Sequence, residues 1–163
     1  MRTYRVVVAD DDPTFRSAAV EVLEADDRFA VVGEVATGAG LAELVQETRA
    51  DVVLLDVRMP GGGPAAAQQL TERFGRRVVM VAVSAQVETA TVFRMLRAGA
   101  TGYLPKGRLG ASMPDHVARC ADGELVLAGP TGAAALQQLL GSMSRPGDGV
   151  GLVACISDGV GSS

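Results

Sequence analysis

The chain has 163 residues and a net charge of −4 at pH 7; 48% of its residues are hydrophobic and 21% are charged. These values are typical of one globular domain, and they do not favour a nucleic-acid-binding protein, which neutralises phosphates with Lys and Arg and stacks bases on aromatic rings. The N-terminus lacks the features of a signal peptide and no apolar run is long enough to span a membrane, so we expect a cytoplasmic protein with no membrane contact.

Five apolar runs rich in valine are spread along the first two thirds of the chain. They cover residues 6–9, 29–35, 52–55, 78–83 and 101–104. The runs are mostly continuous, which is the pattern of strands that are buried on both faces of a parallel sheet. We therefore expect five parallel strands.

The segments between these runs carry apolar residues at helical spacing. They cover residues 13–25, 37–49, 64–74, 88–98 and 111–121. Pro13 and Pro64 stand in the first turn of their helices, and Gly75 follows the end of one. Because strand and helix alternate five times with right-handed crossovers, the pattern predicts an α/β fold with a doubly wound parallel five-stranded sheet and helices on both faces.

The character of the sequence changes after Gly123. Residues 125–127 form a short apolar segment, and residues 131–140 predict an additional C-terminal helix. From residue 141 onward Gly, Ser and Pro are frequent, which is typical of a Gly/Ser-rich linker or tail.

This change suggests a division of the chain into three parts. We expect a main domain over residues 1–123, a linker or accessory helix over 124–141, and a flexible tail or truncated remnant over 142–163. The additional helix carries an apolar stripe made of Leu136, Leu139 and Leu140. An unpaired stripe of this kind leads to the hypothesis that the protein forms a homodimer.

Polar side chains follow four of the predicted strands. These side chains are Asp10, Asp11 and Asp12 after the first strand, Asp56 after the third, Ser84 after the fourth and Lys106 after the fifth. Because the carboxyl ends of strands in an open α/β sheet meet at one crevice, we expect these groups to share a site.

The chemistry of this group indicates phosphoryl transfer. A carboxylate such as Asp56 can form an aspartyl phosphate, and the approach of an anionic phosphate requires neutralisation by a divalent cation. Asp10 and Asp11 are suited to hold that cation, while Lys106 and Ser84 can contact phosphoryl oxygens. Taken singly, the acids have simpler explanations, because Asp12 could cap the following helix and Asp56 could form a turn.

Four ordered motifs resemble the receiver domain of bacterial two-component response regulators, in particular the NarL-like branch. They are Val7-Val8-Ala9-Asp10-Asp11-Asp12-Pro13, Asp51-Val52-Val53-Leu54-Leu55-Asp56-Val57-Arg58-Met59-Pro60, Val83-Ser84-Ala85 and Ala98-Gly99-Ala100-Thr101-Gly102-Tyr103-Leu104-Pro105-Lys106. The resemblance covers residues 4–122 and extends more weakly to about residue 140.

The resemblance implies a flavodoxin-like (βα)5 fold and a signalling switch, not a conventional enzyme. A sensor histidine kinase would phosphorylate Asp56, and Lys106 would bind the phosphoryl group. Ser84 and Tyr103 would be the switch pair, in which the hydroxyl turns toward the phosphate and the aromatic ring turns inward. The resemblance also implies Mg²⁺ as cofactor. Its ligands would be Asp10, Asp11, Asp56 and the backbone carbonyl of Arg58.

Two features depart from the family pattern. Many members carry proline directly after the lysine, whereas here Pro105 precedes Lys106 and Gly107 follows it. NarL-like regulators continue into a basic helix-turn-helix, but the residues after Gly123 include a single basic residue, Arg145. We therefore expect no DNA binding by this chain as given.

Alternative functions remain on the same fold. A Mg²⁺-dependent phosphohydrolase with Asp56 as nucleophile would need a general acid two residues later, where Arg58 stands. A flavin-binding module would need aromatic or hydroxyl-rich loops, which the sequence lacks. A phosphorylation-independent docking module is a further alternative, although every residue needed for phosphorylation is present.

Overall fold

Seven strands form one parallel sheet in the computed structural model, which describes residues 2–85, 88–108, 110, 112–142 and 154–155. The strands are β1 (Tyr4–Ala9), β2 (Phe29–Val35), β3 (Val52–Asp56), β4 (Val79–Ser84), β5 (Gly102–Pro105), β6 (Leu125–Leu127) and β7 (Ala154–Cys155). Their order across the sheet is β2-β1-β3-β4-β5-β6-β7. The order reverses direction between β1 and β3, which makes the sheet doubly wound.

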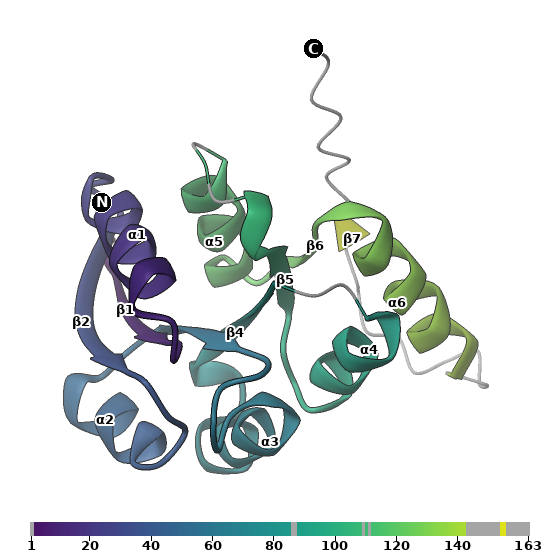
Figure 1. Cartoon of the computed structure of the whole chain (residues 1–163), viewed down its shortest axis with the longest axis horizontal. Coiled ribbons are helices and arrows are strands. Elements are labelled where there is room, and N and C mark those ends of the chain that lie inside the picture. Colours follow the sequence, from purple (N-terminus) through teal and green to yellow (C-terminus); the bar gives the residue numbers. More distant parts are fainter. Residues whose placement is uncertain (1, 86–87, 109, 111, 143–153, 156–163) are drawn as a thin grey trace.

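Helices cover both faces of this sheet. They are α1 (Pro13–Glu24), α2 (Leu41–Thr48), α3 (Gly63–Phe74), α4 (Thr89–Arg97), α5 (Met113–Ala121) and α6 (Gly129–Ser142), with short 3-10 helices η1 (Gly75–Arg77) and η2 (Lys106–Arg108). In Figure 1, α1 and α5 lie on one face of the sheet and α2, α3 and α4 lie on the other. The sixth helix, α6, lies beside α4 near the β6 edge.

The prediction of an α/β doubly wound, flavodoxin-like sheet is confirmed, and the sheet is wider than the five strands expected. The apolar segment 125–127 forms β6, which pairs in parallel with β5, and β7 then pairs with β6. Strand β7 falls within the segment expected to be a tail, and most of that segment lies outside the described residues. The second helix begins at Leu41, four residues later than expected. Gly40 has a left-handed conformation (φ 76°), so the helix cannot extend toward the N-terminus past this residue.

The central strands explain why the apolar runs are continuous. Neighbouring residues of β1 point to opposite faces, and Val6, Val7 and Val8 are all fully buried. Val7 packs in the cluster that includes α2, α3, α4 and α6, and Val6 and Val8 pack in the cluster that includes α1 and α5. Burial of each such side chain stabilises the fold by about 1.5–3 kcal/mol, so the centre of the sheet is a rigid base for groups at the strand ends.

The additional helix α6 packs within the chain. Ala135 and Leu136 are buried in the same apolar cluster as Val92 of α4, and Leu139 is half-buried against it. Leu140 is 51% exposed. Part of the leucine stripe is therefore used inside the chain, and dimerisation through this stripe stays a prediction. In the part of the chain that the structure describes, no helix has the length and apolar character needed to cross a membrane.

Candidate functional site

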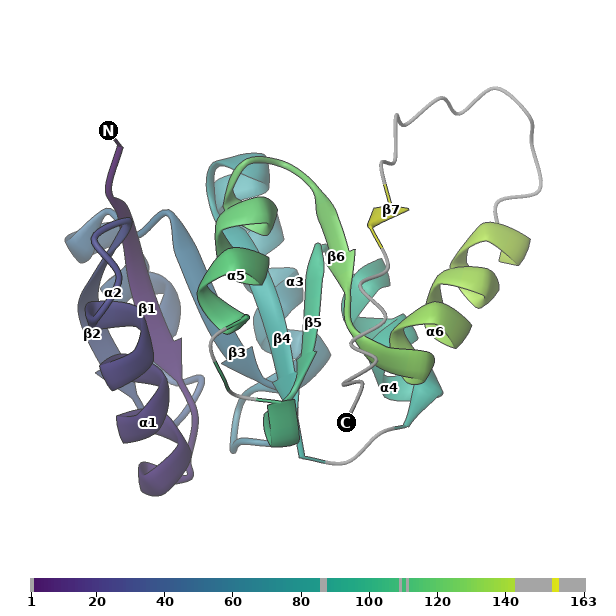
Figure 2. The ribbon, with the colours of Figure 1, turned by 90° about the horizontal axis from the view of Figure 1, so that it is seen from above.

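The carboxyl ends of the central strands point toward the same end of the molecule, as the arrowheads in Figure 2 show. Asp10 directly follows β1, and its backbone N–H donates to the carbonyl of Val35 at 2.9 Å. Asp56 is the last residue of β3 and Ser84 is the last residue of β4. Lys106 directly follows β5. The structure therefore brings the predicted groups to one edge of the sheet.

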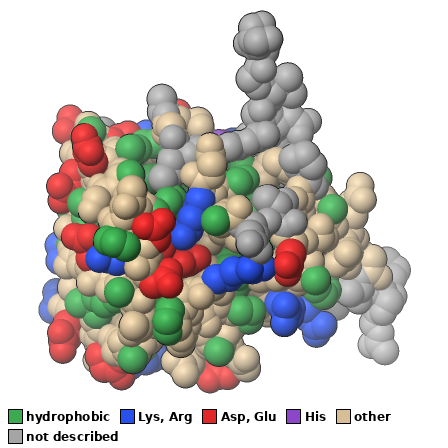
Figure 3. Space-filling view, viewed as in Figure 1, with side chains coloured by type: hydrophobic (Ala, Val, Ile, Leu, Met, Phe, Trp, Pro, Cys, Tyr) green, Lys and Arg blue, Asp and Glu red, His purple; other side chains and the backbone are tan. Residues whose placement is uncertain are grey.

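Asp10, Asp56 and Lys106 form a buried cluster at this edge, which we call the strand-end cluster. The Lys106 Nζ atom lies 2.7 Å from Asp10 Oδ2 and 3.3 Å from Asp56 Oδ2. Asp10 is fully buried, Asp56 is 3% exposed, and the lysine side chain is 13% exposed. Figure 3 faces this end of the sheet and shows acidic side chains gathered beside basic ones near its middle.

The strand-end cluster is electrostatically strained, because two buried carboxylates share one cation. The pKa of Asp56 is raised to about 6: burial and the neighbouring Asp10 raise it, and together they outweigh the Arg58 N–H and the Lys106 charge, which lower it. For Lys106, burial alone lowers the pKa, but the bonds to Asp10 and Asp56 outweigh burial and the pKa is raised. The lysine therefore stays protonated near neutral pH, and Asp56 is charged only in part below pH 7.

A third acid completes a candidate metal site. One oxygen from each of Asp10, Asp11 and Asp56 lies within 4.8 Å of the others. Asp10 Oδ2 is buried and lies 2.7 Å from the lysine ammonium, and among the described residues no other group hydrogen-bonds to it. Carboxylate oxygens are the ligands that hard divalent cations such as Mg²⁺ prefer, so the donor set fits such an ion.

Local hydrogen bonds fix the two buried acids. Asp10 Oδ1 accepts from the backbone N–H of Asp12 at 2.9 Å, and Asp56 Oδ1 accepts from the backbone N–H of Arg58 at 3.2 Å. Asp12 itself caps α1 by accepting from the Thr14 N–H at 3.0 Å, so the simpler interpretation of this residue is confirmed. Both acids are thus held before any ligand binds.

The loop that follows Asp56 depends on a glycine. Gly63 has φ 68°, and a Cβ atom at this position would lie 2.6 Å from the carbonyl oxygen of Val57. No other residue fits this position without a shift of the backbone. As the first residue of α3, this glycine lets the chain pass close to the end of β3.

The two predicted switch residues lie on neighbouring strands. Ser84 is 3% exposed and pairs in register with Pro105, next to the lysine. The Tyr103 ring is fully buried within the apolar cluster that includes α4 and α6, and burial raises its pKa. The ring therefore points into the protein interior, and its hydroxyl has no hydrogen-bond partner among the described residues.

Two further contacts at the site were not expected from the sequence. The Arg58 guanidinium forms an ion pair with Glu88 at 3.0 Å, which joins the loop after β3 to the N-cap of α4. The Phe15 ring of α1 lies under the lysine, with its centroid 4.7 Å from Nζ. Phe15 lies in the segment 13–25, whose apolar residues have helical spacing, and this spacing alone indicates a core position. In the Pro105–Gly107 segment, as in all described residues, the peptide bonds are trans.

Comparisons with known proteins agree on one family. Residues 6–117 match the response regulator receiver domain. The chain is 40% identical over 126 residues to the "Probable transcriptional regulatory protein NarL" of Mycobacterium tuberculosis, covering 76% of this chain and 57% of that relative. It is 37% identical over 112 residues to a protein-glutamate methylesterase/protein-glutamine glutaminase of Myxococcus xanthus, covering 68% of this chain and 31% of the relative.

A solved structure gives the same result. The signal receiver domain of NarL from Mycobacterium tuberculosis superposes with a TM-score of 0.71 at 36% identity, covering 76% of this chain and 100% of that domain. The matched region thus spans 57% of the length of NarL and 31% of the length of the methylesterase. The receiver-domain match over residues 6–117 includes all residues of the strand-end cluster.

Proposed function

Since the chain belongs to the response regulator receiver family, we propose that it is the phosphoacceptor of a two-component phosphorelay and that Asp56 is the acceptor. The observation that carries this proposal is the strand-end cluster. It holds a nearly buried carboxylate 3.3 Å from a protonated lysine, beside two further acids that can hold a cation. The two carboxylates that share the lysine are buried, and the exposed acid Asp11 has an oxygen within 4.8 Å of oxygens of both, so the site has more negative than positive charge. Such an excess is costly to bury in a purely structural ion pair.

The residues would divide the transfer step among them. An Asp56 oxygen attacks phosphorus, the bond from phosphorus to the donor breaks, and the donor leaves with the bonding electrons. The donor would be a phosphohistidine of a sensor histidine kinase. Lys106 already lies within bonding distance of the attacking carboxylate, so its ammonium can move onto a phosphoryl oxygen with little rearrangement. Ser84, at the adjacent strand end, would donate to another phosphoryl oxygen.

Mg²⁺ fits the acidic side of the site. Asp10, Asp11 and Asp56 would supply carboxylate oxygens, and the backbone carbonyl of Arg58 would supply a further ligand. When bound, Mg²⁺ neutralises part of the charge that otherwise repels an incoming phosphoryl group. The protein's own contribution is to hold the carboxylates in place through the N–H groups of Asp12 and Arg58.

The switch would follow from the state of Ser84 and Tyr103. Once Ser84 turns toward a phosphoryl oxygen, the inward position of the Tyr103 ring is favoured, and the surface near the fourth and fifth helices, α4 and α5, changes. The inward ring supports this assignment. Among the described residues nothing hydrogen-bonds to its hydroxyl, and a buried hydroxyl in that state costs about 1–3 kcal/mol. We propose that the protein acts in the cytoplasm as a signalling switch, with homodimerisation as a second mode of interaction.

Arg58 argues against the phosphohydrolase alternative. Its guanidinium stands two residues after Asp56 and is paired with Glu88, so it offers no proton to a leaving group. The docking alternative predicts no covalent modification and is separated by the experiment below.

The experiment is intact-mass spectrometry after incubation with acetyl phosphate and Mg²⁺. We expect the wild-type chain to gain one phosphoryl group and Asp56→Asn to gain none. Asp115→Asn, which changes an exposed aspartate on α5, is the matched control and should behave as wild type. Modification of Asp56→Asn to the wild-type extent would place the acceptor elsewhere. No modification of any variant would favour the docking module.

A further inference from the structure

Lys106 is held on three sides, and the third side is aromatic. Two sides are the carboxylates of Asp10 and Asp56, and the third is the ring of Phe15, whose centroid lies 4.7 Å from Nζ. A cation at this distance over a ring face is attracted by the quadrupole of the ring. The ring therefore binds the ammonium without adding another negative charge to the cluster.

The Phe15 ring is itself firmly fixed. It is 6% exposed on α1, and it packs in the buried cluster that contains Leu104 of β5 and Met113 of α5. One edge of this ring thus belongs to the core, while the lysine lies over its face. A support this rigid restricts where the flexible four-carbon stem of the lysine can place its charge.

We infer that Phe15 is a positioning residue for Lys106: the ring holds the ammonium between the two carboxylates, at the place where a phosphoryl oxygen on Asp56 would arrive. This inference rests on the proposed function of Asp56. A third carboxylate in place of the ring would hold the ammonium more tightly and release it less readily to the phosphoryl group. The ring attracts the ammonium more weakly and forms no hydrogen bond that a phosphoryl oxygen must replace. Removal of the ring should therefore slow the transfer step.

The chain offers a sharp test, because Lys106 is its only lysine. Reductive methylation of that residue, followed by the mass of its peptide, reports how freely the ammonium leaves the cluster. We expect Phe15→Leu to be methylated faster than wild type and phosphorylated by acetyl phosphate about two- to thirtyfold more slowly, the range that one cation–π contact represents. Phe15→Tyr keeps the ring and should restore both rates.

Phe29→Leu is the matched control. Phe29 is 5% exposed in the same cluster, but its ring lies beside Arg28 and not beside the lysine. Changes confined to Phe15→Leu support the inference, and equal changes in Phe15→Leu and Phe29→Leu overturn it, because general loosening would then be the cause. Phe15→Met gives the same comparison if Phe15→Leu does not fold.

The two proposals fail in different ways. If the wild-type chain takes up no phosphoryl group, the proposed function fails, and the role of the ring in phosphoryl transfer fails with it. If the wild-type chain is phosphorylated and Phe15→Leu matches it in both methylation and phosphorylation, only the role of Phe15 is overturned.

Discussion

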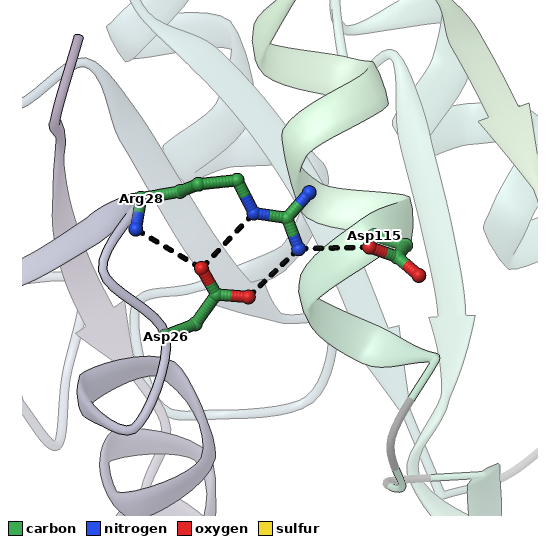
Figure 4. A network of polar contacts seen from close by, with 3 residues as sticks. All are labelled: Asp26, Arg28 and Asp115. Carbon is green, nitrogen blue, oxygen red and sulfur yellow. Dashed lines mark hydrogen bonds and ion pairs between the residues drawn. The ribbon is translucent and has the colours of Figure 1, made fainter. Parts of the chain in front are cut away.

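Two clusters in this molecule each contain two aspartates and one cation, yet the pKa of an aspartate is raised in one cluster and lowered in the other. The first is the strand-end cluster. The second, which we call the loop–helix cluster, joins the loop before β2 to the first turn of α5 and consists of Asp26, Arg28 and Asp115 (Figure 4). The pKa of Asp56 is raised to about 6 in the first cluster, and the pKa of Asp26 is lowered to about 2 in the second.

Geometry explains part of the difference. Arg28 donates from Nε to Asp26 Oδ1 at 3.0 Å and from a terminal nitrogen to Asp26 Oδ2 at 2.7 Å, and the Arg28 backbone N–H adds a third bond at 3.0 Å. These side-chain and backbone bonds lower the pKa of Asp26. A planar guanidinium can satisfy both oxygens of one carboxylate, which a lysine ammonium cannot do.

Burial explains the rest. The side chains of the loop–helix cluster are 23–69% exposed, so water shares their solvation. The aspartate side chains of the strand-end cluster are at most 5% exposed, so their charge depends on a single ammonium. The comparison shows that two aspartates and one cation can form a structural clamp or a site with excess negative charge. Burial, and whether the cation is arginine or lysine, decide between these outcomes.

The largest expected effect is the loss of the lysine charge. Lys106→Met leaves two buried carboxylates without a cation, and breaking a buried pair in this way costs about 3 kcal/mol of unfolding free energy. The loss should be measured by urea unfolding with a chelator at about pH 7.5, and it should shrink at about pH 5, because Asp56 then takes up a proton.

Arg28→Met is the counterpart in the loop–helix cluster. Because that cluster is exposed, we expect a much smaller loss of stability, with no change between these two pH values. An equal loss for Lys106→Met at both pH values would mean that the strand-end cluster is not strained by its carboxylates.

The next effect has the opposite sign. The folded protein holds the Asp56 proton up to a pKa of about 6, whereas the unfolded chain releases it near 3.8. Between these values the folded state binds more protons, so the stability of the metal-free protein should fall as pH rises. The shift corresponds to about 3 kcal/mol, and Asp56→Asn should regain about 2 kcal/mol at pH 7.5, since the amide leaves some bonds unmet.

Metal addition separates charge relief from better packing. Mg²⁺ should stabilise the wild-type protein against urea, and it should stabilise Asp56→Asn less, because one of the three carboxylates is gone. If Asp56→Asn is less stable than wild type in chelator at pH 7.5, the carboxylate at this position is not strained.

Much of this arrangement follows from the sequence. The continuous apolar runs predict the parallel sheet because both faces are buried, and the end of each run then places Asp10, Asp56, Ser84 and Lys106 at one edge. The expectation of a divalent metal site agrees with the spacing of the carboxylate oxygens. The roles assigned to the individual residues stay predictions until phosphorylation is measured.

Other features depend on packing in three dimensions, which a one-dimensional pattern does not contain. Phe15 has the spacing of an ordinary core residue on α1, and only the approach of Lys106 from β5 gives its ring a second use. The ion pair between Arg58 and Glu88 joins side chains that are 30 residues apart in the sequence, and no local pattern predicts such a contact. Strand β7 has only two residues and lies in a segment whose Gly and Ser content predicted a tail, so its pairing with β6 was not expected.

The smallest expected effect completes the comparison. Asp26 has a folded-state pKa of about 2 against 3.8 in the unfolded chain, so its contribution to stability is fully present above about pH 4 and is lost as pH falls toward 2. Asp26→Asn should therefore lower stability slightly at neutral pH, and added salt should reduce the difference, because the pair is exposed. The check is a carboxyl ¹³C titration of Asp26 together with urea unfolding at low and high salt. A normal Asp26 titration would show that the guanidinium fork does not hold in solution, and the contrast between a clamped aspartate and a strained one would then rest on Asp56 alone.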